Sequence, residues 1–596
     1  MQQTPFYLFP ITGRDRTDLL TQLDTLENTV NNGTSLANAA NLAFANYKLD
    51  ASANYILVIL AHNQNELTRE IAAARKGIDN AFAKQEDWQT PLGSYFTTKP
   101  LGKRGGVAYV YPAAVNSYLG IARNLFRLFP NILDDIAIKE LQNLVADISR
   151  VVFPRSLNKL SSRQLETLEQ QFLDDPLAIF DVDMLFTRFI TQIIRDQFQV
   201  KPEFVFGYSL GETSMMSAIG VWDNFTQGIR ALHASPLFAD RLSGAKNAVR
   251  EYWQLPPTQD NNLWANYVLM TTPSQVREYL KHEKRVFLTQ INTPEEVVIA
   301  GQPAACERII QILGCNAFRA PFDHVIHCEA MGSEYNEIAR VNTLPIQKNL
   351  PNVTLYSAAE YGPVRIESGA IANTIATGLS QQLDFPRLVN RVYDDGARIF
   401  IETGAGNICS RWIDKNLANK EHITISLNRR GLDDHSGIIK ALAKLVSHQV
   451  SVDLSPLYTQ VTETNKKSKL TLKKVTLGGQ SITDKILTQE NKQLFRNIST
   501  TTKKSEPINP PATQPEEMPI QNIMDNSLEP KAEVQFVEST QPITLLNQSH
   551  YQQLNANNFR VHKTHDAFLQ SRQEFSKQIS ELIQLQLACA ENLLSE

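Results

Sequence analysis

The sequence predicts an α/β fold in which a small domain is inserted into a larger one. Strand-like and helix-like segments alternate from about residue 105 to residue 456, which favours an α/β core. A Gly-x-Ser-x-Gly motif at Gly207–Gly211 stands between a strand-like run and a helix-like segment. Residues 264–322 follow the order β-α-β-β-α-β, which is the ferredoxin-like arrangement.

The composition excludes several classes of protein. The 596 residues suffice for roughly three or four domains, and 42% hydrophobic and 20% charged residues are typical of a soluble globular protein. A net charge of −4 gives no bulk attraction to nucleic acid or to an anionic membrane. Apolar runs such as Tyr55–Leu60 are too short to span a bilayer. The five cysteines form no CxxC pair or Cys/His cluster, so we expect no metal site and a reducing cytoplasm.

The first 104 residues are predicted to form a small α/β domain. Arg14–Val30 is amphipathic, Tyr55–Leu60 has the pattern of a strand, and Glu66–Ala83 has that of a helix. The buried-strand pattern Val107–Pro112 ends at a proline and opens the larger core.

The insert at 264–322 is predicted to contain two helices, Pro273–Lys281 and Cys306–Leu313. Its four predicted strands are Trp264–Met270, Arg285–Thr289, Glu296–Ile299 and Asn316–Pro321. The middle two strands form a hairpin-like pair.

The composition changes after Tyr458. Lysines alternate with Thr, Asn and Ser, and prolines follow, so residues 461–555 are predicted to be a disordered linker. Within 556–596 apolar residues recur at helical spacing, namely Phe568, Phe575, Ile579, Leu582, Ile583 and Leu587. This amphipathic helix is expected to dock on the core, pair with a copy of itself or bind a partner.

Ser209 has the setting of a nucleophile. A strand, a sharp turn carrying a serine and a helix form a nucleophile elbow, whose glycines let the backbone pass close to the serine. The N-terminus of the following helix favours a developing oxyanion. The alternative is an ordinary turn in which Ser209 caps the helix.

His327 is the preferred candidate, among eleven histidines, for the base that a serine nucleophile needs. It lies just after the insert, where the chain re-enters the larger domain, and residues at such junctions tend to line clefts. His324 is the second candidate. The alternative for either residue is a core or surface histidine.

These segments resemble the acyltransferase domains of fatty acid and polyketide synthases. Gly207–Glu212 matches the family's Gly-His-Ser-x-Gly-Glu, with tyrosine in place of histidine, and His327–Cys328 matches its histidine segment. Asn292–Gly301 and Glu402–Asn407 match two further family motifs. A narrower resemblance, to the B subunit of bacterial polyunsaturated fatty acid synthases and to related cyanobacterial glycolipid synthases, is carried by Asp384–Val389, Asp395–Glu402 and Asn428–His435.

The resemblance implies an α/β-hydrolase-like large subdomain, within residues 105–460, that carries the ferredoxin-like insert. It also implies that residues 1–104 are similar to the linker that joins a ketosynthase to its acyltransferase. One loop departs from the family, because Tyr111–Ser117 stands where typical members have Phe-Pro-Gly-Gln-Gly-Ser-Gln.

The resemblance implies that Ser209 is acylated and that His327 is the base. In the family a backbone carbonyl orients the histidine, and the nearest match here is Asn407. The backbone N–H groups of Leu210 and Ala114 are expected to form the oxyanion hole, because backbone donors need no particular side chain.

Two further residues are candidate substrate contacts. Tyr208 replaces the family histidine beside the serine, and Ala234 stands near the register at which malonyl-specific members carry an arginine. Since a malonyl carboxylate needs a cationic partner, the missing arginine predicts an uncharged acyl group and malonyl-CoA as a poor substrate.

The resemblance implies transfer of an acyl group from acyl-CoA, through an acyl-serine, to the phosphopantetheine thiol of an acyl carrier protein, with no bound cofactor. The implied partners are the carrier protein and other synthase subunits or a ketosynthase, and self-association through the C-terminal helix is a further expectation. Two alternatives remain open. One is a thioesterase that uses the same dyad with water as the acceptor, and the other is a catalytically weak scaffold subunit, which the altered loop Tyr111–Ser117 supports.

Overall fold

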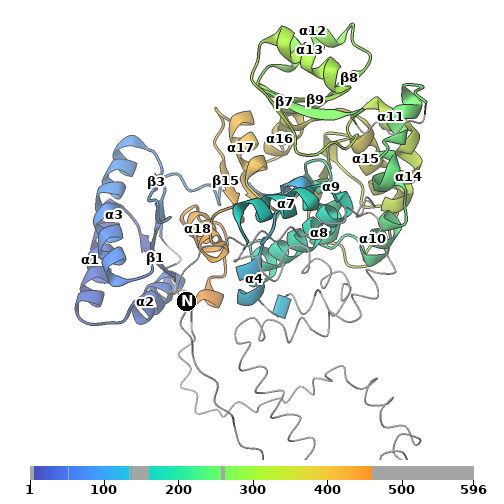
Figure 1. Cartoon of the computed structure of the whole chain (residues 1–596). Coiled ribbons are helices and arrows are strands. Elements are labelled where there is room, and N and C mark those ends of the chain that lie inside the picture. Colours follow the sequence, from blue (N-terminus) through green and yellow to red (C-terminus); the bar gives the residue numbers. More distant parts are fainter. Residues whose placement is uncertain are drawn as a thin grey trace, which may run out of the picture. The chain divides into compact units, whose positions relative to one another are not determined.

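Three β-sheets and their helices make up the described part of the chain (Figure 1). The computed structural model describes residues 6–50, 53–129, 131–132, 136, 160–223, 225–256 and 262–458. All of them belong to one compact unit that spans residues 1–462. The linker predicted at 461–555 and the helix predicted at 556–596 lie outside the described residues.

The first sheet lies in the N-terminal segment and has the strand order β1–β2–β4–β3. Its strands are β1 (Tyr7–Gly13), β2 (Tyr55–Ala61), β3 (Trp88–Gln89) and β4 (Tyr95–Phe96). Its helices are α1 (Arg16–Asn31), α2 (Leu36–Leu49) and α3 (Gln64–Lys84). The preceding residues, Asp15, Ser35 and Asn63, cap the three helices with side-chain oxygens. The predicted strand and the predicted helix are present as β2 and α3, the amphipathic segment forms α1, and the other elements of this segment are additions.

The second sheet has six strands in the order β12–β11–β6–β5–β14–β15. They are β5 (Gly106–Tyr111), β6 (Phe204–Gly207), β11 (Thr354–Ser357), β12 (Gly362–Pro363), β14 (Ala397–Glu402) and β15 (Ile423–Ser426). All neighbouring strands are parallel except β11 and β12. Every residue of β5 is buried, and its side chains alternate between two cores, with Tyr109 in one and Val110 in the other. A parallel sheet covered on both faces explains this pattern.

Helices cover both faces of the six-stranded sheet. One core includes side chains of α8, α9 and α18, and the other includes side chains of α16 and α17. The helices of this region are α4 (Arg123–Leu128), α7 (Ser162–Leu173), α8 (Pro176–Gln192), α9 (Gly211–Ile219), α10 (Phe225–His233), α11 (Asn247–Tyr252), α14 (Tyr335–Asn342), α15 (Ser368–Ser380), α16 (Phe385–Asp394), α17 (Ile408–Asn416) and α18 (Asp434–Ser447).

The strands of the predicted insert lie in the third sheet, whose strand order is β10–β7–β9–β8–β13. In chain order its elements are β7 (Ala265–Leu269), α12 (Pro273–Leu280), β8 (Val286–Thr293), β9 (Glu296–Gly301), α13 (Pro303–Leu313) and β10 (Ala317–Arg319). Figure 1 shows α12 and α13 side by side over this sheet. The predicted β-α-β-β-α-β order is therefore confirmed. A short later strand, β13 (Leu383–Asp384), adds to it parallel to β8.

Helix α18 packs against two of the sheets, because it contacts β2 of the first and β15 of the second. Ser447 at its end donates a hydrogen bond of 2.8 Å to the carbonyl of Ile56 on β2. The next residue, His448, places Nε2 3.1 Å from the hydroxyl of Tyr95 on β4. These contacts join the N-terminal segment to the end of the core.

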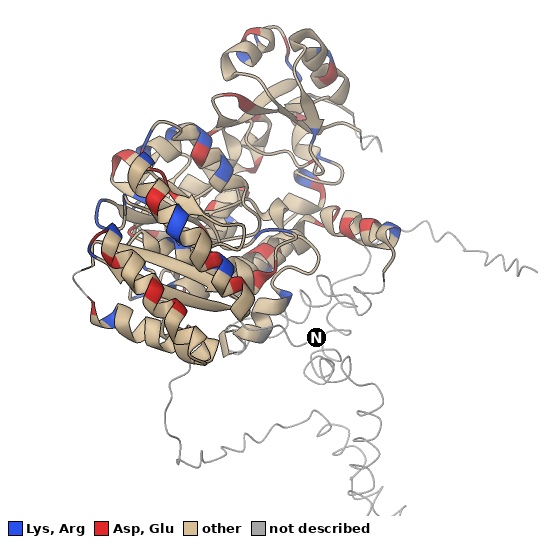
Figure 2. Cartoon of the chain, turned by 90° about the vertical axis from the view of Figure 1, so that its left-hand side faces the viewer, with Lys and Arg blue, Asp and Glu red and all other residues tan. Residues whose placement is uncertain are grey.

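Charged side chains of both signs are interspersed on the helices that face the viewer in Figure 2. Ion pairs link α1 to α3, since Arg75 lies 2.7 Å from Asp24 and 2.6 Å from Glu27, and Arg16 lies 2.7 Å from Asp79. Exposed pairs of this kind add little stability, but they leave this face without a strong field of one sign. Among the helices that the structure describes, none is long and apolar enough to cross a membrane.

Candidate active site

Ser209 sits on a sharp turn between β6 and α9. Its φ angle is +59°, a strained value for a residue that carries a side chain. The flanking glycines are required by close contacts: a Cβ on Gly207 would lie 2.2 Å from the backbone nitrogen of Glu212, and a Cβ on Gly211 would lie 2.1 Å from the carbonyl oxygen of Tyr111. The turn therefore has the backbone of a nucleophile elbow.

His327 lies against this serine. Its Nε2 is 2.7 Å from Ser209 Oγ, and its Nδ1 is 2.7 Å from the carbonyl oxygen of Gly378. A carbonyl only accepts hydrogen bonds, so Nδ1 carries the proton and Nε2 is free to accept the proton of the serine hydroxyl. The backbone N–H of His327 also donates to the carbonyl of Leu379, at 2.7 Å. The ring is thus held in the tautomer that a general base needs.

The orienting carbonyl is not the one that the sequence indicated. The family resemblance implies Asn407 in this role, but the Nδ1 partner is the carbonyl of Gly378 near the end of α15. Asn407 instead precedes α17, and its carbonyl accepts a hydrogen bond from the backbone N–H of Arg411. The carbonyl that orients the His327 ring is therefore that of Gly378 and not that of Asn407.

Burial sets the protonation of the dyad. His327 is fully enclosed, and desolvation lowers its pKa to about 4. The imidazole is therefore neutral near pH 7, as a base must be. Burial also raises the pKa of the neighbouring Cys328 thiol to about 12, which keeps it protonated and unreactive beside the serine.

His324, the second candidate base, has a different environment. Its Nδ1 lies 2.9 Å from Ser243 Oγ, and its carbonyl accepts a hydrogen bond of 3.3 Å from the side chain of Asn266. The structure thus brings His327, and not His324, to Ser209.

The loop after β5 lies beside the elbow. Tyr111 pairs with Gly207 across the two strands, and the N–H of Tyr208 donates to the carbonyl of Tyr111 at 2.8 Å. Ala114 opens a short 3-10 turn just beyond this point, and Leu210 stands at the N-cap of α9. Both predicted oxyanion donors therefore lie on loops at the same edge of the sheet, although the altered sequence of the first loop lacks the family's glycines.

Tyr208 links the elbow to the small sheet. Its hydroxyl lies 2.6 Å from Asn292 Oδ1 and 2.9 Å from Gln290 Oε1, both on β8. Its ring packs against Phe385 and Trp412. The side chain is buried in this contact, which gives it a packing role in place of the predicted substrate contact.

Ala234 is exposed just after the end of α10, and its role as a substrate contact stays a prediction. His233 beside it places Nε2 3.0 Å from the carboxylate of Asp181. Arg230, one turn earlier, is exposed. The described residues also contain no group of three or more His, Cys, Asp or Glu side chains arranged to hold a metal.

Two buried carboxyl groups support the elbow helix. Burial raises the pKa of Glu212 to about 7, and its side chain accepts the N–H of Ala358 at 3.2 Å. Burial likewise raises the pKa of Asp183, on α8, to about 7, and Asp183 accepts the hydroxyl of Ser214 at 2.5 Å. Neither group contacts Ser209 or His327 through a hydrogen bond in the described structure, so both hold α9 in place.

Comparisons with known proteins agree with this geometry. The chain is 28% identical over 412 residues to the B subunit of the polyunsaturated fatty acid synthase of Thraustochytrium sp., a match that covers 66% of this chain and 20% of that relative. It is 24% identical over 251 residues to the malonyl CoA-acyl carrier protein transacylase of Haemophilus influenzae, covering 40% of this chain and 73% of the relative.

The chain is similar to acyltransferases of fatty acid and polyketide synthesis. Its fold matches the acyltransferase domain from module 8 of the salinomycin polyketide synthase, with a TM-score of 0.58 at 17% identity, over 76% of this chain and 98% of that domain. The predicted fold class and the predicted resemblance are therefore confirmed. No protein-family model matches the chain. Because the match spans only a fifth of the Thraustochytrium protein, the activity of that whole protein does not carry over directly.

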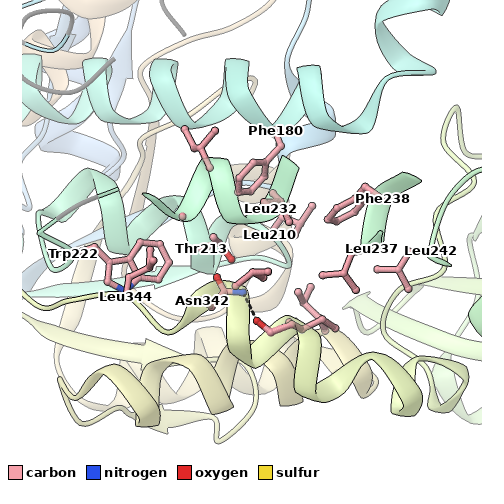
Figure 3. Close-up of a pocket in the computed structure, with 15 residues that line it drawn as sticks. Phe180, Leu210, Thr213, Trp222, Leu232, Leu237, Phe238, Leu242, Asn342 and Leu344 are labelled. Carbon is pink, nitrogen blue, oxygen red and sulfur yellow. Dashed lines mark hydrogen bonds between the residues drawn. The ribbon is translucent and has the colours of Figure 1, made fainter. Parts of the chain in front are cut away.

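An apolar pocket of about 40 Å³ lies beside Leu210 (Figure 3). Leu210, which follows Ser209, and Leu379, which follows Gly378, both line it. No sequence pattern indicates this pocket, because its lining residues occupy ordinary apolar positions of helices that are far apart in the chain.

Proposed function

We propose that this chain is an acyltransferase that carries an acyl group on Ser209 between two thiols. The observation that carries the proposal is the 2.7 Å contact between Ser209 Oγ and His327 Nε2, with Nδ1 fixed on the carbonyl of Gly378. The donor is an acyl-CoA thioester. The acceptor is the phosphopantetheine thiol of an acyl carrier protein, and other synthase subunits or a ketosynthase are its further partners.

Acylation begins when Ser209 Oγ attacks the thioester carbonyl carbon while its proton passes to His327 Nε2. The carbonyl electron pair moves onto oxygen, and the backbone N–H groups of Leu210 and Ala114 stabilise that oxyanion. When the oxyanion collapses, the carbon–sulfur bond breaks and the proton on His327 passes to the leaving sulfur. The products are the acyl-serine ester and free CoA.

Deacylation reverses these steps with a new thiol. The incoming thiol gives its proton to His327 Nε2 as its sulfur attacks the ester carbonyl, and the proton then returns to Ser209 Oγ. Atoms and charge balance without metal or bound cofactor.

Burial of His327 suits both half-reactions. With a pKa lowered to about 4, its imidazolium is a strong acid and gives its proton quickly to the leaving group. The carbonyl of Gly378 stabilises that transient charge in the place of a carboxylate. The site is therefore a dyad.

The test is intact-protein mass spectrometry after mixing with acetyl-, octanoyl-, palmitoyl- and malonyl-CoA. Wild type should gain one acyl mass, and so should Ser217→Ala, the matched control at a serine of α9, the helix that follows the turn. Ser209→Ala should gain none, since loss of a nucleophile of this kind costs several orders of magnitude in rate. An adduct that persists in Ser209→Ala contradicts the proposal.

A chase separates transfer from hydrolysis. Added pantetheine thiol should remove the acyl group from Ser209 much faster than buffer does. Equal loss in buffer alone would identify a thioesterase, in which water is the acceptor.

A further inference from the structure

Tyr208, the residue before the nucleophile, is tied to the small sheet as well as to the large one. Its backbone belongs to the turn after β6, but its hydroxyl donates to Asn292 Oδ1 at 2.6 Å and lies 2.9 Å from Gln290 Oε1, both on β8. The side chain is 4% exposed, so water does not compete for the hydroxyl. The nucleophile turn is therefore held by a strand of the insert.

Asn292 is itself fixed on both sides. Its amide nitrogen donates to Glu296 Oε1 at 3.2 Å, and its carbonyl accepts a hydrogen bond of 3.0 Å from the side chain of Asn416. Because a carboxylate oxygen only accepts hydrogen bonds, the contact with Glu296 turns the amide so that Oδ1 faces Tyr208. Glu296 Oε1 also accepts the indole N–H of Trp412 at 2.7 Å. Since Asn416 and Trp412 belong to α17, the acceptor of Tyr208 is clamped between the insert and the large domain.

Strand β8 also holds the segment that carries the partner of His327. That segment runs from the end of α15 into β13, which pairs with β8 in parallel and places Leu383 opposite Gln290. The residue before β13, Gln382, donates from its side chain to the carbonyl of Leu288 on β8 at 2.7 Å. One strand thus contacts both the nucleophile turn and the chain that follows α15.

The carbonyls that hold His327 stand just before this pairing. Gly378 accepts the Nδ1 proton and Leu379 accepts the backbone N–H, each at 2.7 Å. Ser209 and His327 are therefore both connected to β8, one through the Tyr208 side chain and the other through the backbone after α15. Two short connections to one strand fix the separation of Oγ and Nε2, and a displacement of about 1 Å there can cost about 10²-fold in rate.

Both members of the dyad have strained backbones. The φ angle is +59° at Ser209 and +58° at His327, in the left-handed region that residues with a side chain rarely adopt. Such a conformation persists only where surrounding contacts impose it. On the serine side the adjacent residue is Tyr208, and its contacts on β8 supply part of that constraint.

We propose that Tyr208 is a positioning residue, which sets the distance between Ser209 Oγ and His327 Nε2. It does so through its hydroxyl, which Asn292 and Gln290 hold on β8. The inference rests on the proposed function and gives the insert a part in the alignment of the dyad. Tyr208 acts without touching the substrate, because its hydroxyl is engaged on β8 and its ring packs against aromatic side chains of the large domain.

The first test is Tyr208→Phe, which removes the hydroxyl and keeps the ring. The ring packs against Phe385 and Trp412, with centroid distances of 5.1 and 4.8 Å, and these contacts remain in the variant. Rapid-quench mass spectrometry measures Ser209 acylation at several concentrations of the donor that labels wild type fastest among acetyl-, octanoyl-, palmitoyl- and malonyl-CoA. The maximal rate should fall by about tenfold, and the half-saturating concentration should stay within about twofold of wild type.

Two results would overturn this role. One is an unchanged maximal rate in Tyr208→Phe. The other is a raised half-saturating concentration with no loss of maximal rate, which would make Tyr208 a substrate contact. Either result leaves the proposed function standing, because wild type is still acylated on Ser209. Absence of labelling of wild type by all four donors would overturn the proposed function and this inference with it.

Tyr356→Phe is the matched control. Tyr356 lies on β11 in the same core as Tyr208, is 1% exposed and donates its hydroxyl to Asp395 Oδ2 at 2.7 Å. Asp395 precedes β14, so this bond points to the edge of the parallel sheet opposite Ser209. Tyr356→Phe should lower the melting temperature about as much as Tyr208→Phe does and leave the acylation rate within about twofold of wild type. Equal loss of rate in both variants would mean general destabilisation and overturn the assignment.

A double variant tests whether Tyr208 acts through Asn292. Asn292→Leu replaces the acceptor by an apolar side chain of similar size, and Glu296 keeps its bond from Trp412. If the two residues act as one unit, the rate of Tyr208→Phe/Asn292→Leu should be within about twofold of the slower single variant. Multiplied losses, about 10²-fold in all, would show independent effects and overturn the role of the contact. Tyr208→Phe and its control decide the question alone if the melting curve shows that Asn292→Leu does not fold.

Discussion

At the scale of single residues, the dyad depends on a neutral His327. Because the base must be unprotonated, the acylation rate should rise as pH increases through its pKa and then stay level. Burial lowers that pKa to about 4, so the plateau should extend from about pH 5 to pH 8. Rapid-quench mass spectrometry of Ser209 acylation measures the profile. A midpoint near 6.5, typical of an exposed imidazole, would contradict this prediction.

Alanine variants of the two neighbouring histidines should separate catalysis from packing. His327→Ala should slow acylation by about 10²–10⁴-fold with the fold intact by circular dichroism. His324→Ala removes a contact to Ser243 and should act mainly on the melting temperature. If His324→Ala has the larger effect on rate, His327 is not the base.

Motifs in the sequence were enough to find Ser209 and His327, because side-chain chemistry at fixed spacing leaves a readable pattern. The partner of His327 Nδ1 left none. It is a backbone carbonyl, 51 residues further along the chain, and any residue type at position 378 could supply it. The family motif pointed to Asn407 instead, and only the packing of α15 against the histidine segment identifies Gly378.

At the scale of elements, α8 and α9 are joined by a buried carboxyl group. Asp183 accepts a hydrogen bond from Ser214, and burial raises its pKa to about 7. The folded protein therefore binds this proton more tightly than the unfolded chain, whose pKa is about 3.9. The protonated Asp183 carboxyl group therefore contributes fully to the free energy of unfolding below about pH 4. This contribution is lost as the pH rises through about 7.

Asp183→Asn removes this titration and should flatten the dependence of stability on pH. The difference between the melting temperatures at pH 5 and pH 8 should be smaller in the variant than in wild type. Glu212, whose pKa is also raised to about 7, titrates in both proteins, so the comparison isolates Asp183. An unchanged difference would show that Asp183 keeps its charge throughout this range.

The elbow also depends on close approach between α9 and the end of β5. An alanine Cβ at Gly211 would lie 2.1 Å from the carbonyl oxygen of Tyr111, and backbone atoms cannot swing aside as a side chain can. Gly211→Ala should therefore displace Ser209 and slow acylation by about 10²-fold or more.

Gly378→Ala is the matched control for this change. The nearest atoms to its new Cβ would lie at 3.9 Å, an ordinary contact, and the carbonyl that holds His327 would remain. Acylation by Gly378→Ala should stay close to wild type. If both variants lost the same fraction of the acylation rate, the close approach of Gly211 to Tyr111 would not be the cause of the loss.

The order of helices and strands could be predicted where a pattern of apolar residues extends over a long segment. The insert was recognised because its strands and helices follow one another in a familiar order, and the buried strand β6 was recognised from its apolar run. Strand β13 was not, since two residues have no periodicity. The walls of the pocket were also missed, because Gly228 on α10 and Leu344 after α14 meet only in the folded chain.

At the scale of the whole molecule, the described chain ends by packing back onto its own beginning. Tyr458 stacks on Phe44 of α2, with ring centroids 4.1 Å apart and planes 6° apart. Its hydroxyl donates to the carbonyl of Leu8 on β1 at 2.8 Å. The N-terminal sheet and the core around the six-stranded sheet are thus expected to unfold together.

Substitution of Tyr458 should test that coupling. Tyr458→Phe should cost about 1 kcal/mol through the lost hydrogen bond, and Tyr458→Ala about 2 kcal/mol or more through the lost packing. Denaturant titration followed by two probes measures both values. Separate transitions in wild type would show that the N-terminal segment is an independent folding unit.

Removal of residues 463–596 tests the remaining sequence prediction, which lies outside the described part of the chain. Residues 1–462 form a compact unit with their own cores, so the melting temperature and Ser209 acylation should persist after truncation. The predicted stripe that contains Phe568 and Leu582 would be exposed unless it is covered, and covering it requires the core, a second copy or a partner. We expect truncation to lower the number of chains per particle measured by light scattering or to abolish carrier or partner binding. A lower melting temperature would identify the core as the docking surface, and an unaltered number of chains per particle, with unaltered binding and melting, would contradict a docking role.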